Sequence, residues 1–365
     1  MINLYTFKEF FKSIDQTIFG CLFIILAAGL LSLYSADQSS LSEFKSQLMH
    51  LFIGVFLMIF ISKIHPKIIF FYTPFIFIMG ILLLVWVCLF GYEVNGSRRW
   101  IDIGFMKFQP SELFKLILPI TLAWFYQQNE KIISYKYHVL AFILTLVPCY
   151  FILMQPDLGT SLMIVFSSFV IIYAAGLPKK FIITGFIISL LCSPFIWGNL
   201  KEYQQNRILN LFDPSSDALG IGYQTIQSLI ALGSGGLIGK GWLNSSQTQL
   251  NFLPETTTDF IFAVYSEEFG FIGVLTILAV YILLLLRVIF MASKMQDTFS
   301  RLASLGLLMS IFIGLFVNLG MISGVLPIVG APLPFFSYGG TSMVVSLVSI
   351  GIIISLYNHK SLIAN

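Results

Sequence analysis

Long apolar stretches dominate this chain, and short polar segments separate them. A membrane-spanning helix needs about 20 mostly apolar residues. Ten stretches meet that requirement: 17–36, 47–64, 68–90, 110–127, 138–154, 158–176, 181–198, 261–286, 302–323 and 339–357. The longest segment without a span, 199–260, follows the seventh stretch. The pattern predicts an all-α polytopic membrane protein with ten transmembrane helices, one integral membrane domain over residues 1–365, and a large extracytoplasmic loop between helices 7 and 8.

Composition supports this class and excludes others. Hydrophobic residues make up 57% of the chain and charged residues only 10%, whereas a soluble protein carries roughly 25% charged residues. The 37 phenylalanines and a mean hydropathy of +0.90 exclude a disordered chain. The net charge of +3 is too small to indicate a nucleic-acid partner. The four cysteines lie in apolar runs without a CxxC pair, which is typical of small membrane hydrophobes.

The distribution of charge predicts the orientation of the spans. With the N-terminus in the cytoplasm, 12 of the 20 cations fall in inner segments, as the positive-inside rule expects. These are Lys8, Lys12, Lys63, Lys67, Lys131, Lys136, Lys179, Lys180, Arg287, Lys294, Arg301 and Lys360. Conversely, 13 of the 17 acids lie at or beyond the outer face. We therefore expect both termini in the cytoplasm and the chemistry on the outer side.

The first polar region on that side runs from residue 95 to residue 115. Glu112 and Lys115 lie three residues apart, on one face of a helix that Pro110 starts. Charges inside a membrane are costly, and they usually face a pocket or one another. A local pair between the two side chains is the structural alternative. The cations Arg98 and Arg99 in the preceding outer loop favour the functional interpretation.

A second region, QPDLGTS at 155–161, places another Gln-Pro pair at the outer start of a span. Backbone N–H groups at such a helix start carry partial positive charge. Two helix starts on one face can flank an anion, as broken helices do in transporters. The alternative is that Asp157 only caps its own helix.

The third region combines a glycine-rich loop with a row of acids. The loop 233–241 carries Lys240, but it lacks the spacing and the strand–helix context of a phosphate-binding loop. Asp259 immediately precedes the eighth span, where it could act as an N-cap. Glu267 and Glu268 would lie two turns inside that span, which capping does not explain. Further along, Pro332 and Pro334 forbid a continuous helix before the tenth span.

Together these stretches resemble the SEDS family (shape, elongation, division and sporulation) of bacterial inner-membrane proteins. The motifs SRRWIDIG, FQPSExxK, QPDLGTS, GSGGLxGKG, FLPExxTDFIFAVxxEExG and PLPFFSYGGTS occur in the family order between about residues 15 and 358. The sequences of residues 103–108 and 228–241 are more similar to the elongation branch of the family than to its division branch. The resemblance implies a ten-helix fold and peptidoglycan glycosyltransferase activity on lipid II, for cell elongation and rod shape.

The resemblance also implies roles for individual residues. Asp259 matches the essential aspartate of the family, and Glu112 and Lys115 match its charged pair in the fourth span. Other polar positions of the family pattern fall on Arg99, Asp157, Lys240 and Glu255. The family often has a basic residue before the glutamine that starts the second span. This chain has Ser46 there, with Lys45 one position earlier.

The expected chemistry joins a sugar hydroxyl to an anomeric carbon and releases undecaprenyl pyrophosphate. We expect Asp259 to act as general base for the acceptor hydroxyl, since this alcohol is a poor nucleophile at neutral pH. One inverting displacement suffices to make the β-1,4 glycan. Arg99, Lys115 and Lys240 are the candidates to stabilise the leaving diphosphate. A divalent cation such as Mg²⁺ or Mn²⁺ is compatible with the oxygen ligands, but the sequence has no diagnostic metal spacing.

Two other functions stay open at this point. Intramembrane charges and helices broken by proline also suit a flippase that moves lipid II across the bilayer. A non-catalytic scaffold for a transpeptidase is the second alternative, although a scaffold would not need a buried Glu112 or Lys115. The expected partners are a class B penicillin-binding transpeptidase and other elongation-complex membrane proteins. The expected location is the bacterial inner membrane, with the active site on the periplasmic side.

Overall fold

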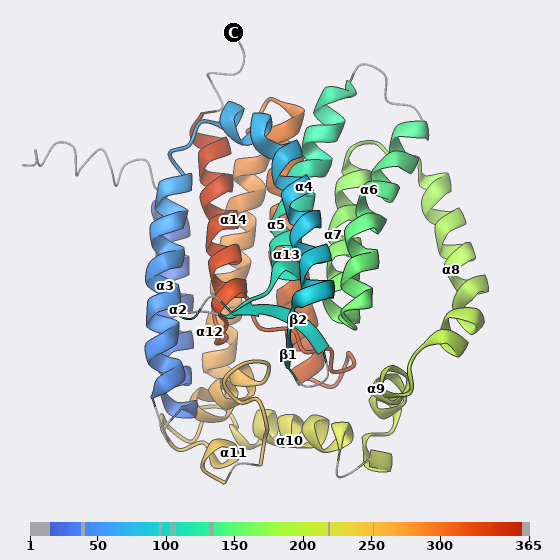
Figure 1. Cartoon of the computed structure of the whole chain (residues 1–365). Helices are drawn as coiled ribbons and strands as arrows, with labels where there is room; N and C mark the ends of the chain where they lie inside the picture. The colour runs from blue at the N-terminus through green and yellow to red at the C-terminus, as the bar shows by residue number, and fades with distance from the viewer. Residues whose placement is uncertain are drawn as a thin grey trace, which may run out of the picture.

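The computed structural model contains a bundle of long helices with a layer of shorter elements at one end (Figure 1). It describes residues 15–37, 41–94, 97–102, 104, 107–130, 135–217, 220–250 and 252–359. Lys8, Lys12, Lys131 and Lys360, which contribute to the predicted orientation, lie outside the described residues. The long helices are α2 (Gln16–Ala36), α3 (Ser42–Ile61), α4 (Pro66–Phe90), α5 (Pro110–Gln128), α6 (Tyr135–Met154), α7 (Leu158–Ala174), α8 (Lys179–Asn199), α12 (Ile261–Ser293), α13 (Thr298–Ile322) and α14 (Gly340–Asn358).

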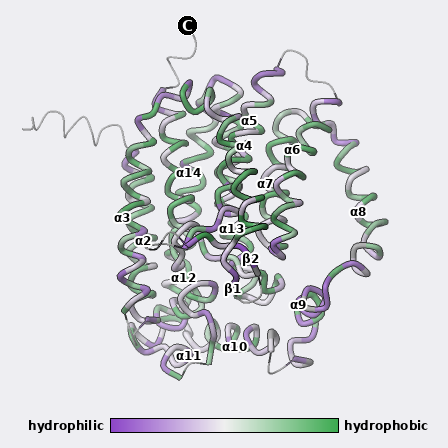
Figure 2. The backbone as a smooth tube through the Cα atoms, in the orientation of Figure 1, coloured by the Kyte–Doolittle hydropathy of each residue, from purple (hydrophilic) through white to green (hydrophobic). Residues whose placement is uncertain are grey.

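Each predicted span coincides with one of these helices. Among the described residues, seven helices are long and apolar enough to cross a membrane: α2, α3, α4, α6, α12, α13 and α14. Helix α7 is apolar but shorter. Hydrophobic residues cover the bundle along its length, and hydrophilic residues gather toward its ends (Figure 2). The prediction of a mainly helical, multi-pass membrane protein is confirmed.

Helices α5, α13 and α14 form the buried centre of the bundle. Most side chains of α13 and α14 are shielded from the surroundings, whereas α4 and α6 expose large apolar side chains. Small residues allow the central helices to approach closely. A Cβ atom on Gly306 of α13 would lie only 2.4 Å from a methyl group of Ile171 on α7. Helix α8 stands apart from the bundle, and most of its described side chains are exposed (Figure 1).

Contacts between helix ends show that the chain alternates in direction through the bundle. Arg287, near the end of α12, pairs with Asp15 at the start of α2 at 2.5 Å. The side chain of Gln127 at the end of α5 accepts a hydrogen bond from the backbone N–H of Phe299 in α13. Both contacts lie at the end that we expect to face the cytoplasm.

The opposite end carries elements that the sequence pattern did not predict. A three-stranded antiparallel sheet of β1 (Tyr92–Val94), β2 (Ser97–Asp102) and β3 (Lys107–Phe108) precedes α5. The expected outer loop after α8 contains α9 (Glu202–Phe212), the 3₁₀ helix η2 (Pro214–Asp217), α10 (Ile221–Ser234) and α11 (Ser246–Gln249). Among the candidate site residues, Arg99 lies in β2, and Lys240, Glu255 and Asp259 lie between α10 and α12.

Candidate active site

The starts of α5 and α7 meet around the carboxylate of Asp157. Its Oδ1 accepts a hydrogen bond from the backbone N–H of Thr160 at 3.1 Å, so Asp157 does cap α7. Its Oδ2 accepts from Nε2 of Gln109, the residue just before α5, also at 3.1 Å. The two Gln-Pro helix starts are therefore joined and Asp157 caps its own helix, whereas the binding of an anion between the two starts stays a prediction.

Strand β2 brings Arg99 to the same place. Arg99 Nε donates to the carbonyl oxygen of Gln155 at 2.8 Å, and Nη2 donates to that of Pro156 at 2.9 Å. Its Nη1 lies 3.9 Å from Asp157 Oδ2. Because successive side chains of a strand point to opposite faces, Arg98 turns away from this contact and pairs with Glu93 instead. Arg99 thus fixes the turn that starts α7.

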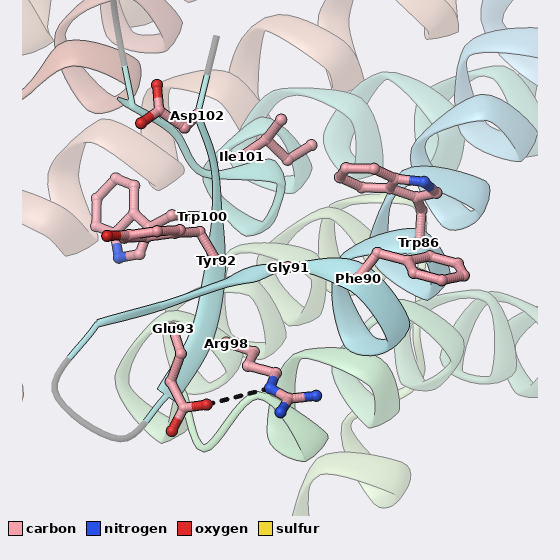
Figure 3. A pocket seen from close by; sticks show the side chains of 9 residues that line it. All are labelled: Trp86, Phe90, Gly91, Tyr92, Glu93, Arg98, Trp100, Ile101 and Asp102. Atoms are coloured by element: carbon pink, nitrogen blue, oxygen red, sulfur yellow. Dashed lines mark hydrogen bonds and ion pairs between the residues drawn. The ribbon is translucent and has the colours of Figure 1, made fainter. Parts of the chain in front are cut away.

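Arg98 and Glu93 belong to an open hollow on the other face of the hairpin (Figure 3). Aromatic side chains from the end of α4 and from the strands surround it, and its volume is about 400 Å³. The Arg98–Glu93 pair at its edge is 3.3 Å long, and both side chains are more than half exposed. Aromatic rings at the end of a membrane helix are typical of the membrane–water interface.

A separate cavity of about 180 Å³, which we call the outer cavity, lies beside Arg99 and the start of α7. Its remaining walls come from α9 and from the loop between α13 and α14. Its charged wall residues are Arg99, Asp157 and Arg207, and the start of α7 adds Leu158 and Gly159. Positive charge therefore faces this cavity from two sides.

Asp259 lies next to the outer cavity. A Cβ atom on Gly330, a wall residue, would lie 3.5 Å from Asp259 Oδ2. Helix α12 begins after Phe260, which occupies the N-cap position, so Asp259 is not the cap. Burial, together with the negative charge of Glu255, raises the pKa of Asp259 to about 7, and the charge of Arg207 opposes this shift. Such a carboxyl group can exchange a proton near neutral pH.

Buried amides hold the loops around Asp259 in place. Asn318 of α13 donates to the backbone oxygen of Asp259 at 2.9 Å and to that of Ala331 at 2.7 Å. On α3, Gln47 donates to the backbone oxygen of Ser337 at 3.0 Å. Tyr338 donates its backbone N–H to the carbonyl oxygen of Thr257. The proline-rich loop before α14 is therefore fastened to the Asp259 loop.

Glu255 belongs to this loop as well. Its backbone has a positive φ of 55°, and its Oε2 accepts a hydrogen bond from the hydroxyl of Thr258 at 3.0 Å. Its carbonyl oxygen accepts from the N–H of Phe260. Glu255 thus shapes the turn that leads to α12 and also contributes negative charge near Asp259.

Glu112 and Lys115 form the local ion pair that the sequence analysis gave as the structural alternative. Lys115 Nζ lies 2.6 Å from Glu112 Oε1, and the side chains are only 15% and 7% exposed. The pair lies in the first two turns of α5, whose start reaches Asp157 through Gln109. Both charges are thus buried and mutually neutralised.

Lys240 occupies a different part of the structure. Its Nζ lies 2.5 Å from Oε1 of Glu267, a residue with no exposed surface, and 3.0 Å from the hydroxyl of Ser246. Glu267 also accepts hydrogen bonds from Ser245 Oγ at 2.6 Å and from Ser246 Oγ at 2.5 Å. Because α12 rises 1.5 Å per residue, this cluster is roughly 12 Å along the helix from Asp259.

The glycine-rich loop itself repairs a break in α12. Helix α12 is interrupted at Gly270, which has a φ of 65°. The carbonyl oxygens of Glu267 and Glu268 accept hydrogen bonds from the N–H groups of Lys240 and Gly241, both at 3.0 Å. In return, the N–H groups of Phe271 and Ile272 donate to carbonyl oxygens of the loop at Gly236 and Leu237. The loop thus satisfies the backbone groups that the break would otherwise leave unpaired.

Comparison with known proteins identifies the family. A family model described as the cell cycle protein FtsW/RodA/SpoVE matches residues 9–362. The chain belongs to this family. The peptidoglycan glycosyltransferase MrdB of Escherichia coli K12 is 39% identical over 352 residues, which are 96% of this chain and 95% of that protein. Stage V sporulation protein E of Bacillus subtilis is 34% identical, with 92% and 95% covered.

Solved structures of the family have the same fold. A chain of a peptidoglycan synthase complex, described as coordinating polymerization and crosslinking, superposes with a TM-score of 0.83. It is 32% identical, and the match covers 95% of this chain and 98% of that one. The rod shape determining protein RodA of Thermus thermophilus superposes with a TM-score of 0.72 at 28% identity, covering 95% and 97%. The resemblance to the SEDS family is confirmed.

Within this family fold, the structure brings together Arg99, Asp157, Glu255 and Asp259 and keeps Lys240 in the Glu267 cluster. It also adds two residues that the sequence reasoning missed, Arg207 in α9 and Asn318 in α13. Asn318 could have been found from the sequence, because it is an asparagine inside an apolar span. No pattern in the sequence indicated that α9 would present a cation to the cavity.

The described part of the chain contains no cluster of side chains typical of a metal site. No group of three or more histidine, cysteine, aspartate or glutamate side chains is placed to hold an ion there. Both oxygens of Asp157 already accept hydrogen bonds. A Mg²⁺ ion often needs only one or two carboxylates together with substrate phosphates. Asp259 is the carboxylate beside the outer cavity that fits this pattern.

Proposed function

We propose that this chain is a peptidoglycan glycosyltransferase that polymerises lipid II into β-1,4 glycan strands for cell elongation, releasing undecaprenyl pyrophosphate. The observation that carries the proposal is the position of Asp259, a carboxylate with a pKa of about 7 beside a cavity that two arginines face. The similarity to the Escherichia coli peptidoglycan glycosyltransferase MrdB, at 39% identity, supports it.

Asp259 is suited to act as general base. A base works best when its pKa lies near the operating pH, and such catalysis contributes typically 10²–10⁴-fold. The carboxylate would accept the proton of the acceptor sugar hydroxyl while that oxygen attacks the anomeric carbon of the donor. The attack inverts that carbon, so no covalent sugar–enzyme intermediate is required.

The leaving diphosphate needs positive charge at the moment when the bond breaks. Arg99, Arg207 and the N–H groups at the start of α7 supply it around the outer cavity. We propose that the pair Glu112–Lys115 contributes from α5 when substrate contacts Lys115. The contacts of Lys240 with Glu267 support a structural role for this lysine in preference to diphosphate binding.

A divalent ion such as Mg²⁺ or Mn²⁺ is part of the proposal. It would be held by Asp259 and by the oxygens of the substrate diphosphate, and it would neutralise charge on the leaving group. The arginines act on the leaving diphosphate with or without this ion, whereas an ion on Asp259 would lower the pKa of that carboxyl group and weaken it as a base.

We further propose that the ten helices cross the bacterial inner membrane, with both termini in the cytoplasm and the outer cavity on the periplasmic side. The inner location of most cations supports this orientation. A class B penicillin-binding transpeptidase and other elongation-complex membrane proteins are the proposed partners. The similarity to a chain of a complex that coordinates polymerization and crosslinking supports the first of these.

A purified-protein assay tests the function. The chain in detergent, supplied with lipid II and the transpeptidase, should make glycan without a membrane, which neither a flippase nor a scaffold can do. Asp259→Asn should lose at least 100-fold in rate while it elutes as a folded protein. Retained polymerisation in this variant would remove Asp259 from the role of base. Glycan synthesis absent from the unaltered protein would favour the flippase or scaffold alternative.

A further inference from the structure

An apolar groove runs along the side of the bundle, at the end opposite to the outer cavity. Helix α4 forms one wall, α3 and α14 form the other, and α5 forms the floor. The groove has a volume of about 390 Å³, and most of its lining is isoleucine, including Ile64, Ile68, Ile76 and Ile352. It lies among the spans and is distinct from the site described above.

Both threonine hydroxyls of the lining are satisfied within their own helices, and the partly exposed Tyr72 adds one further hydroxyl group to a lining that is otherwise apolar. Two threonines line the groove, Thr73 on α4 and Thr121 on α5. Thr73 Oγ1 donates to the carbonyl oxygen of Ile69 at 2.7 Å, and Thr121 Oγ1 donates to that of Ile117 at 2.8 Å. Both hydroxyls are therefore satisfied within their own helices. The groove selects a ligand with a long apolar body.

The dimensions of the groove fit one hydrocarbon chain. From Pro66, where α4 starts, to Ile76 the helix rises roughly 15 Å, which is half of the hydrocarbon core of about 30 Å. The volume of the groove, about 390 Å³, lies at the lower end of the roughly 300–1,000 Å³ that small-ligand pockets occupy.

Positive charge gathers at the polar end of the groove. The turn between α3 and α4 carries Lys63 and Lys67, both exposed. The N-terminus of the 25-residue helix α4 lies in the same turn, where His65 Nδ1 accepts from the N–H of Lys67. The hydroxyl of Ser355 on α14 bonds the carbonyl oxygen of Ile64, which fixes the turn against the groove.

His65 of this turn lies beside His359, which follows α14. The rings of His65 and His359 lie 4.9 Å apart. Loss of solvent contact, together with the positive charges of His359 and Lys67, lowers the pKa of His65. An apolar slot about as long as one leaflet thus ends at the two lysines of this turn, which complements a lipid with one chain in the slot and a phosphate at its head.

We propose that this groove is a binding site for an anionic phospholipid of the cytoplasmic leaflet, with an acyl chain along α4 and the headgroup phosphate at Lys63 and Lys67. The choice of leaflet rests on the orientation proposed above, whereas the chemistry of the ligand does not. Each lysine near a membrane surface attracts anionic lipid with about 1 kcal/mol. We therefore expect roughly a fivefold preference for anionic over zwitterionic lipid from each lysine.

The test measures bound lipid directly. The purified full chain is reconstituted in phosphatidylcholine vesicles that contain a trace of spin-labelled phosphatidylglycerol or spin-labelled phosphatidylcholine. Electron paramagnetic resonance then gives the immobilised fraction of each label. We expect a larger immobilised fraction for phosphatidylglycerol. The double change Lys63→Gln and Lys67→Gln should remove most of this preference, whereas the same changes at Lys179 and Lys180 at the start of α8 should leave it intact.

A second variant tests the slot itself. Ile76 lines the groove and is 42% exposed, so Ile76→Trp can fill the slot without disturbing the core. It should lower the immobilised fraction of phosphatidylglycerol. Phe75→Trp, one position away on the lipid-facing side and 61% exposed, is the matched control and should change nothing.

Two outcomes would overturn the proposal. Equal immobilisation of the two labels in the unaltered protein would show that lipid at this surface is unselective. An unchanged phosphatidylglycerol signal in Ile76→Trp would place the bound lipid elsewhere. Neither outcome bears on glycan synthesis, because polymerisation by Ile76→Trp in detergent is measured separately and is expected to match that of the unaltered protein.

Discussion

Two carboxylates about two turns apart at the start of α12 have opposite environments. Glu267 has no exposed surface, and Lys240, Ser245 and Ser246 all donate hydrogen bonds to it. Asp259 is only partly buried, and within the described residues no hydrogen-bond donor reaches its carboxylate. Glu255 places a second negative charge near it, which raises its pKa together with burial.

This difference separates a structural charge from a reactive one. A carboxylate whose lone pairs are all occupied cannot accept a proton from a substrate without losing those bonds. A carboxylate without donors, with a pKa raised to about 7, has free lone pairs and exchanges a proton at neutral pH. The same helix therefore begins with a group suited to chemistry and continues with one that holds the outer loop.

The largest expected effect comes from Glu267. Glu267→Ala should lower the free energy of unfolding by about 1–3 kcal/mol for each buried donor that it leaves unpaired, chiefly the hydroxyl of Ser245 and the backbone N–H of Gln247. Thermal unfolding followed by the retained fraction of folded protein in detergent measures this loss. Lys240→Met should also lower the free energy of unfolding, because it leaves the fully buried carboxylate of Glu267 without its counter-charge. Should Lys240→Met keep full thermal stability yet lose polymerisation, Lys240 would belong with the reactive group instead.

The glycine-rich loop gives the next effect. Gly239 has a φ of 87°, and a Cβ atom there would lie 2.1 Å from the carbonyl oxygen of Glu268. Gly239→Ala should therefore lower the free energy of unfolding by about 1–3 kcal/mol or more. Gly233→Ala is the control, since a Cβ atom there meets nothing within 4 Å and alanine favours the helix. Equal melting temperatures for the two variants would contradict the role of the loop in joining α12.

The pH dependence of the reaction tests Asp259 without a mutation. The base form of Asp259 is half populated at a pH of about 7. Because only this form accepts a proton, the rate should rise roughly tenfold between pH 6 and pH 8. Single-turnover glycan synthesis at saturating lipid II measures this limb. A rate that is already constant at pH 6 would mean that the base has an ordinary carboxylate pKa of about 4.

The pH dependence of stability that Asp259 causes has the opposite sign to that of an ion-paired carboxylate. Its pKa is raised in the folded state, so its contribution to stability is complete below the unfolded value of about 4 and is lost as the pH rises through about 7. Asp259→Asn should accordingly melt at a higher temperature than the unaltered protein at pH 8, and the difference should shrink at pH 5. If Asp259→Asn loses activity and gains stability, Asp259 serves the reaction at a cost to the stability of the fold.

The sequence predicted the bundle well because the bilayer imposes one length and one composition on each span. It also predicted that the starts of α5 and α7 lie on the same face, and the structure joins them through Gln109 and Asp157. It could not place Lys240, because the glycine-rich loop is shaped by backbone bonds to α12 that have no sequence period. Arg207 was missed for a similar reason, as α9 reaches the cavity only through the path of the outer loop.

The smallest expected effect compares neighbouring arginines on one strand. Arg99 donates to two carbonyl oxygens and approaches Asp157, whereas Arg98 pairs with Glu93 and both side chains of that pair are more than half exposed. Lysine lacks the forked donors of arginine, so Arg99→Lys should lose about one hydrogen bond, roughly 1 kcal/mol. Arg98→Lys should be neutral because exposed pairs contribute little.

Melting temperature and the KM for lipid II check both variants. Since Arg99 both shapes the start of α7 and faces the outer cavity, a rise in KM without a fall in melting temperature would assign it to substrate. A fall in melting temperature alone would place Arg99 with Glu267 on the structural side of the comparison.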